Sequence, residues 1–156
     1  MKQLLLILFS LFLVTGCEVR PKRHNHQSVS WYHLSGFTYK KSTALPPEVR
    51  SLDGQLVSLS GYMVPLELQG DQVLSFVLVR DQLMCCFGKT PAMNEFVMVS
   101  MSDRRSTPLV SDRPVTIWGR FQASEERDNG VVISLFRLEA EQVEILQGTT
   151  SGWKAN

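Results

Sequence analysis

The chain of 156 residues is poor in histidine, and its three histidines all precede residue 34. It has no excess of either charge, with 16 lysines and arginines against 15 aspartates and glutamates. This balance argues against nucleic-acid binding, which usually depends on a clustered basic surface. The sequence also lacks a glycine-rich phosphate loop, a His-Glu-x-x-His motif and a Gly-x-Ser-x-Gly motif. A thiol nucleophile after residue 34 would have no histidine base on its own domain, so we expect no enzyme. From the charge balance we expect no nucleic-acid partner.

The chain also lacks an apolar run of the roughly twenty residues that a membrane-spanning helix needs. Its longest such run, Leu4 to Val14, follows the positively charged Lys2 and precedes the small residues Thr15 and Gly16. This order is typical of a secretory signal, which we expect over residues 1–16. The alternative is an uncleaved N-terminal anchor helix.

The end of this segment is more specific than an ordinary signal. Val14-Thr15-Gly16-Cys17 resembles the bacterial lipobox, in which small residues precede an obligatory cysteine. The resemblance implies cleavage before Cys17, a diacylglycerol on its thiol and a further acyl chain, such as palmitate, on its amino group. Glu18 stands where an aspartate commonly retains lipoproteins at the inner membrane. We therefore expect an outer-membrane lipoprotein that contacts the lipid bilayer through Cys17 and faces the periplasm.

Residues 17–47 are expected to form the lipidated cysteine and a tether, because basic residues and Pro21 are mixed without apolar periodicity. The aromatic residues between Val29 and Tyr39 are unusual for a linker, so part of that stretch is expected to pack against the domain or to contact a partner. The domain itself is expected over residues 48–147, and residues 148–156 are expected to form a tail.

Five extended segments separated by turn residues follow Leu52. They are Gln55–Val64, closed by Pro65, then Val73–Arg80, Glu95–Met101, Pro114–Phe121 and Val131–Leu138. Glu139–Leu146 is expected either to extend the last strand or to form a short helix. We predict an all-β fold, a small five-stranded antiparallel OB-like barrel, because Gly61 and Gly119 would permit strong coiling. An SH3-like barrel or an open sandwich is the alternative.

Two motifs resemble the bacterial DUF3299 family, over roughly residues 50–146. One is the first strand, and the other joins the second and third strands. The matching residues are Gly61, Tyr62, Pro65, Cys85, Cys86, Phe87, Gly88, Pro91, Asn94 and Glu95. The family has no established activity, so the resemblance implies a fold and a motif but no reaction. Some relatives are encoded near ABC-transporter components, which implies a transport or envelope role by association.

The adjacent Cys85 and Cys86 remain once Cys17 is assigned to lipid. Neighbouring Cα atoms lie about 3.8 Å apart, whereas unstrained disulfides need about 4.4–6.8 Å. Three hypotheses follow for this pair: two structural thiols, a soft-metal site for zinc or Cu(I), or a strained vicinal disulfide or reactive thiol. Further metal ligands would come from His24, His26, His33, Met84 or Met93.

Two more candidates have alternative interpretations. His24 and His26 are either a weak metal clasp, because an i, i+2 pair shares one side of an extended chain, or solvated residues of the tether. Asn94 and Glu95 could act as acid and base, but Glu95 is better explained as a partner of Lys89 or a cap of loop amides. The resulting functional hypothesis is a non-enzymatic accessory or binding component of an envelope or metal-transport system of the ABC type. The alternative is a zinc- or copper-binding or thiol-redox protein that uses Cys85 and Cys86.

Overall fold

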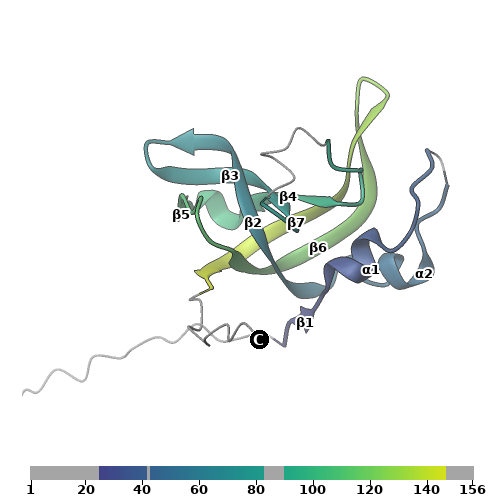
Figure 1. Ribbon diagram of the computed structural model, residues 1–156, viewed down its shortest axis with the longest axis horizontal. Helices are drawn as coiled ribbons and strands as arrows, with labels where there is room; N and C mark the ends of the chain where they lie inside the picture. Colours follow the sequence, from purple (N-terminus) through teal and green to yellow (C-terminus); the bar gives the residue numbers. More distant parts are fainter. Residues whose placement is uncertain (1–24, 42, 83–89, 147–156) are drawn as a thin grey trace, which may run out of the picture.

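The computed structural model describes residues 25–41, 43–82 and 90–146. Their strands form one mixed sheet in the order β1-β2-β6-β7-β4-β3-β5 (Figure 1). The strands are β1 (Gln27–Ser28), β2 (Leu56–Gln69), β3 (Gln72–Val79), β4 (Phe96–Met101), β5 (Thr107–Pro108), β6 (Val115–Asp128) and β7 (Val131–Ile145). Three short helices accompany them: α1 (Trp31–Ser35), α2 (Pro47–Arg50) and the 3-10 helix η1 (Ser102–Arg104). The prediction of an all-β fold is confirmed.

Five of the strands close into a ring. β2 pairs with β6 through its first half and with β3 through its second half, so the order β2-β6-β7-β4-β3 returns to β2. Four of these pairings are antiparallel, but β4 and β7 pair in parallel. The prediction of an entirely antiparallel sheet is therefore wrong at this pair. β4 and β7 are separated in sequence by β6, so no hairpin fixes their relative direction.

Three ring strands are longer than the sequence pattern predicted. β2 and β6 each have 14 residues and β7 has 15, so Glu139–Ile145 extends the last strand. Pro65 lies inside β2 instead of ending it, at a register irregularity opposite Phe76. β6 pairs with β2 only as far as Gly61, so this part of β2 has a single neighbour. Proline is tolerated there because one side of the strand needs no ladder hydrogen bond.

Two glycines bring strands of the ring unusually close. A Cβ atom at Gly61 would lie 2.5 Å from the carbonyl oxygen of Val79, and one at Gly119 would lie 2.0 Å from that of Glu139. Gly119 also lies where the register between β6 and β7 shifts, beside Trp118. These positions therefore exclude any side chain, and they allow the strong coiling that closes a five-stranded ring.

The ring encloses the hydrophobic core. Phe76, Phe121 and Phe136 are its largest fully buried side chains, and the rings of Phe121 and Phe136 lie 5.6 Å apart between centroids. These aromatic side chains, with the inward-facing valines and leucines of the strands, are removed from water. Their burial is the main source of folding free energy.

The segment expected to be a tether is packed structure from Gln27 onward. β1 pairs in parallel with β2, and Val29, Leu34 and Leu45 are buried in the core (Figure 1). The indole Nε1 of Trp31 donates a hydrogen bond of 2.7 Å to the carbonyl oxygen of Ser60. The expectation of packing between Val29 and Tyr39 is confirmed, and the packed stretch also includes Leu45. The packing arises because β3 leaves the first half of β2 with one edge open, and β1 covers that edge.

Candidate functional site

The two ends of the β3–β4 connection are fixed to other parts of the molecule. Gln82 donates from Nε2 to the carbonyl oxygen of Ser111 over 2.8 Å. At the other end Asn94 is 4% exposed, and its Nδ2 donates to the carbonyl oxygen of Phe37 over 2.6 Å. A buried side-chain amide that donates a hydrogen bond to a distant backbone carbonyl stabilises the contact between the two segments. Asn94 therefore joins this connection to the segment that follows α1.

Glu95 forms a local turn at the same place. Its Oε2 accepts a hydrogen bond from the backbone N–H of Ala92 over 2.9 Å, and its own N–H donates to the carbonyl oxygen of Ala92. The structure thus gives Glu95 the amide-capping contact that was the alternative to acid and base chemistry. Cys85, Cys86, Phe87 and Gly88 lie outside the described residues, as do Cys17 and His24.

Three of the remaining motif residues belong to β2, and the fourth is Pro91. Gly61 is the point of close approach to β3, Tyr62 is partly buried opposite Val79, and Pro65 lies at the irregularity. Pro91 is partly buried beside the turn of Ala92 and Glu95. In the described part of the chain these residues shape the ring and the ends of the β3–β4 connection, so their contacts are structural.

The two histidines in the described part of the chain contact residues outside the β3–β4 connection. Nε2 of His26 lies 3.8 Å from Oε2 of Glu141, and Nδ1 of His33 lies 2.9 Å from the hydroxyl of Ser30. Figure 1 shows β1, which His26 precedes, near the bottom of the view, whereas β3 and β4 lie higher. The structure therefore does not bring His26 to the described ends of the cysteine connection. Residues 25–41, 43–82 and 90–146 contain no group of three or more His, Cys, Asp or Glu side chains placed to hold a metal ion.

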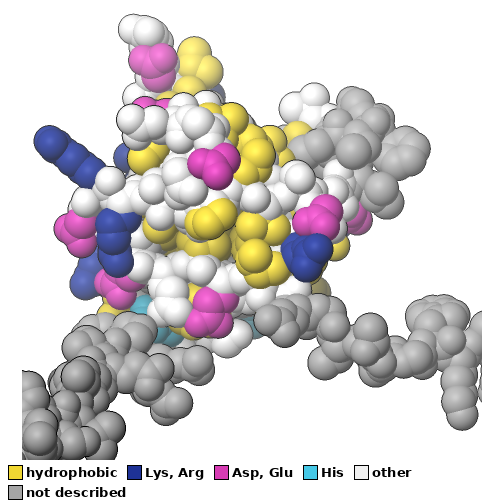
Figure 2. Space-filling view, turned by 90° about the vertical axis from the view of Figure 1, so that its left-hand side faces the viewer, with side chains coloured by type: hydrophobic (Ala, Val, Ile, Leu, Met, Phe, Trp, Pro, Cys, Tyr) yellow, Lys and Arg dark blue, Asp and Glu magenta, His cyan; other side chains and the backbone are white. Residues whose placement is uncertain are grey.

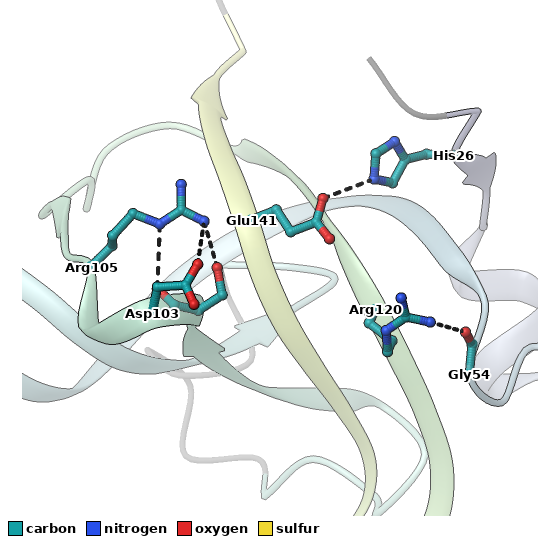
Figure 3. Close-up of polar contacts among 7 residues, drawn as sticks. His26, Gly54, Asp103, Arg105, Arg120 and Glu141 are labelled. Atoms are coloured by element: carbon teal, nitrogen blue, oxygen red, sulfur yellow. Dashed lines mark hydrogen bonds and ion pairs between the residues drawn. The ribbon is translucent and has the colours of Figure 1, made fainter. Parts of the chain in front are cut away.

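A polar hollow lies at the first residues of β1 and β2, next to Arg120 of β6. Its volume is about 610 Å³, and it is lined by Asn25, His26, Gln27, Gln55, Leu56 and Arg120 together with Gly54. Arg120 donates from Nη1 to the carbonyl oxygen of Gly54 over 2.7 Å, which fixes the guanidinium (Figure 3). Figure 3 also shows Glu141 of β7 pointing toward His26. The hollow is thus lined by an arginine that is hydrogen-bonded to Gly54 and by a histidine that contacts Glu141.

The β2–β3 hairpin, on the left-hand side of Figure 1, carries part of an exposed apolar surface, here called the hairpin face. Leu66 and Leu68 come from the β2–β3 hairpin, and Leu109 follows β5 and donates from its backbone N–H to the carbonyl oxygen of Asp71. Ile145 and Leu146 lie at the end of β7, and all five side chains are at least 41% exposed. Figure 2, which views this side, shows hydrophobic side chains gathered between a few charged ones. Clusters of this kind mark interaction sites more often than scattered leucines do.

Sequence patterns did not identify the hollow. The alternation of Thr116, Trp118 and Arg120 along β6 was a readable signal that Arg120 faces outward. No pattern in the sequence places Arg120 near Gln27 or Gly54. Gln27 is brought to this part of the sheet only by the parallel pairing of β1 with β2, which spans two residues. Contacts from such a short pairing depend on the fold and not on a local pattern.

The ring defines an all-β protein built on a single closed mixed sheet. The described residues contain no helix long and apolar enough to cross a membrane. A model of the DUF3299 family, described as proteins of unknown function, matches residues 18–145, so the chain belongs to that family. The prediction from the two motifs is thereby confirmed.

The structural comparison agrees with this assignment. The chain is similar to a crystal structure of a DUF3299 family protein from Pseudomonas aeruginosa PAO1, with a TM-score of 0.54 and 24% identity. The match covers 64% of this chain and 66% of that chain. At this identity the likeness shows the fold alone. No curated protein matches the chain.

Proposed function

We propose that this protein is a non-enzymatic outer-membrane lipoprotein, anchored through Cys17, whose domain binds an envelope protein in the periplasm. The signal and lipobox pattern of residues 1–17 supports the address. The hairpin face carries the binding role, because leucines exposed on a hairpin and on the neighbouring turn lower the free energy only when another surface covers them. The partner would be a component of an envelope or metal-transport system of the ABC type.

The order of pairing supports an OB-like assignment of the ring. In an OB fold five strands form a partly open Greek-key barrel, and binding uses its second and third strands with the connecting loops. The ring of β2, β3, β4, β6 and β7 has this number of strands, and β2 is shared between both halves. The β2–β3 hairpin that carries Leu66 and Leu68 occupies one of those loop positions. The proposed docking surface therefore lies where OB-like proteins carry their binding loops.

A photo-crosslinking residue placed at Leu68 in cells tests this proposal. The crosslinked protein is identified by mass spectrometry and purified, and its affinity for the lipoprotein is measured directly. We expect Leu68→Glu to weaken that affinity at least tenfold, which is about 1.4 kcal/mol, because it places a charge in an apolar contact. The folded state should be unaffected, since Leu68 is 50% exposed.

Tyr32→Glu is the matched control, because Tyr32 is 82% exposed on α1, away from the hairpin face. It should leave the affinity unchanged. The docking proposal fails if both variants weaken binding equally, or if Leu68→Glu has no effect on the purified complex.

The alternative function is zinc or copper binding, or thiol redox chemistry, at Cys85 and Cys86. The observation that favours it is the fixation of both ends of the β3–β4 connection, through Gln82 to Ser111 and through Asn94 to Phe37. Fixed ends reduce the entropy lost when a loop closes around a ligand. Two thiolates are suitable ligands for either metal.

Metal analysis and thiol titration of protein folded in the periplasm distinguish the hypotheses for this pair. The metal site predicts bound zinc or copper that disappears in the Cys85→Ser/Cys86→Ser variant. A vicinal disulfide predicts no free thiols until a reductant is added, as expected for a strained and readily reduced bond. Two unreactive thiols without metal would leave only a structural role.

A further inference from the structure

Most of the residues that line the polar hollow have side chains with hydrogen-bond donors. Asn25, Gln27 and Gln55 provide side-chain amides, Arg120 provides a guanidinium and His26 an imidazole, with Leu56 the apolar exception. No carboxylate is among the lining residues. A ligand that accepts hydrogen bonds through several oxygens would complement this set.

The guanidinium of Arg120 is already positioned. Its Nη1 is fixed on the carbonyl oxygen of Gly54 at 2.7 Å, which leaves its other N–H donors for a ligand. A planar guanidinium matches the two oxygens of a carboxylate or phosphate in a bidentate arrangement. Because the side chain is ordered before binding, less rotamer entropy is lost when a ligand arrives.

The nearby acidic side chains do not cancel this charge inside the hollow. Glu139 is the cross-strand partner of Arg120, but it does not line the hollow and forms no ion pair with Arg120 in the described chain. Glu141 lies 3.8 Å from His26 and does not line the hollow either. Arg120 therefore remains the permanent positive charge of the hollow.

We propose that the hollow is a binding site for an oxyanion, a carboxylate or phosphate group, with Arg120 as its main ligand. Gln27 and Gln55 add amide donors, and His26 also lines the hollow. Such a group could belong to a small soluble anion or to an anionic lipid headgroup. The site itself is argued from the described residues, and only the headgroup source rests on the anchoring proposed above.

Isothermal titration of the purified full chain in neutral detergent tests the site, with inorganic phosphate and citrate as probes. We expect both anions to bind at low salt and to bind more weakly as salt screens the charge. Arg120→Gln should reduce the affinity at least tenfold. Arg137→Gln is the matched control, because Arg137 lies on β7, pairs with Glu126 and does not line the hollow. It should leave the affinity unchanged.

A second variant separates binding from folding. Gln55→Glu places a negative charge in the hollow while Arg120 stays in place, so it should also reduce anion affinity at least tenfold with an unchanged melting temperature. The proposal is overturned if Arg137→Gln weakens binding as much as Arg120→Gln does. It is also overturned if both hollow variants bind as the wild type does, or if uncharged trehalose binds as tightly as phosphate.

Soluble short-chain lipids identify the source of the anion. Short-chain phosphatidylglycerol should bind more tightly than inorganic phosphate if a headgroup is the ligand, with the zwitterionic phosphatidylcholine as control. Preference for inorganic phosphate or citrate would assign a soluble anion. Loss of anion binding would refute the site alone, whereas release of the wild-type chain from membranes would refute the anchoring alone.

Discussion

A Gly119→Ala variant is expected to lose about 3 kcal/mol of unfolding free energy, at the upper end of what overpacking costs. The added Cβ would lie 2.0 Å from the carbonyl oxygen and 2.8 Å from the carbonyl carbon of Glu139. Both are backbone atoms of β7, so no side chain can rotate to relieve the contact. β6 and β7 must separate at this point, which breaks the closest approach in the ring and disturbs Phe121 in the core.

Urea unfolding followed by circular dichroism measures this loss. Gly130→Ala is the matched control, because Gly130 has a positive φ of 79° but nothing lies within 4 Å of an added Cβ. It should cost only about 1 kcal/mol, the penalty for a left-handed alanine. If the two variants were equally stable, steric exclusion at Gly119 would not hold the ring together.

A Cys17→Ser variant is expected to move almost the whole protein from the membrane fraction to the soluble fraction. The physical reason is the number of acyl chains, since each buried methylene contributes about 0.8 kcal/mol and stable anchoring needs more than one chain. Serine offers no thiol for the diacylglycerol, so the mature chain would lack the acyl chains that hold it in the bilayer. Ultracentrifugation of lysed cells, with detection of the protein in pellet and supernatant, measures the change.

Cys85→Ser serves as the control for this experiment and should stay with the membranes, because it removes a thiol from the domain without touching the lipobox. Separation of inner and outer membranes on a density gradient then tests the role of Glu18, with Glu18→Asp expected to shift the protein toward the inner membrane. Sedimentation of Cys17→Ser with the membranes as before would refute the lipid anchor.

The positions of the strands were largely predictable. Leu59 and Ile117 stand at alternating apolar positions of the segments expected to be strands, and both are buried in the structure. The fourth segment was expected to end at Phe121, whereas β6 continues to Asp128 and is joined to β7 by two consecutive positive φ angles at Asn129 and Gly130. The interpretation failed at Pro65, because a proline ends a strand only where the missing N–H is needed for a hydrogen bond to a neighbouring strand.

The packing of the N-terminal segment was only partly predictable. Its aromatic residues indicated some contact, but its basic and polar composition favoured a tether up to residue 47. In the structure Tyr39 donates from its hydroxyl to Oε1 of Glu125 at 2.5 Å, and Asp53 accepts from the backbone N–H of Ala123. These partners are far apart in sequence, so no local pattern contained them.

The sequence by itself determined the family and the all-β class, because motif spacing and residue alternation are local patterns; the address remains a prediction from the N-terminal signal. Only the tertiary structure decided the parallel pairing of β4 with β7, the use of β1 to cover the open edge of β2, and the placement of Arg120 beside Gln27. The physical reason is that these features join residues distant in the chain. They form because closing the ring buries more apolar surface than any single hairpin could.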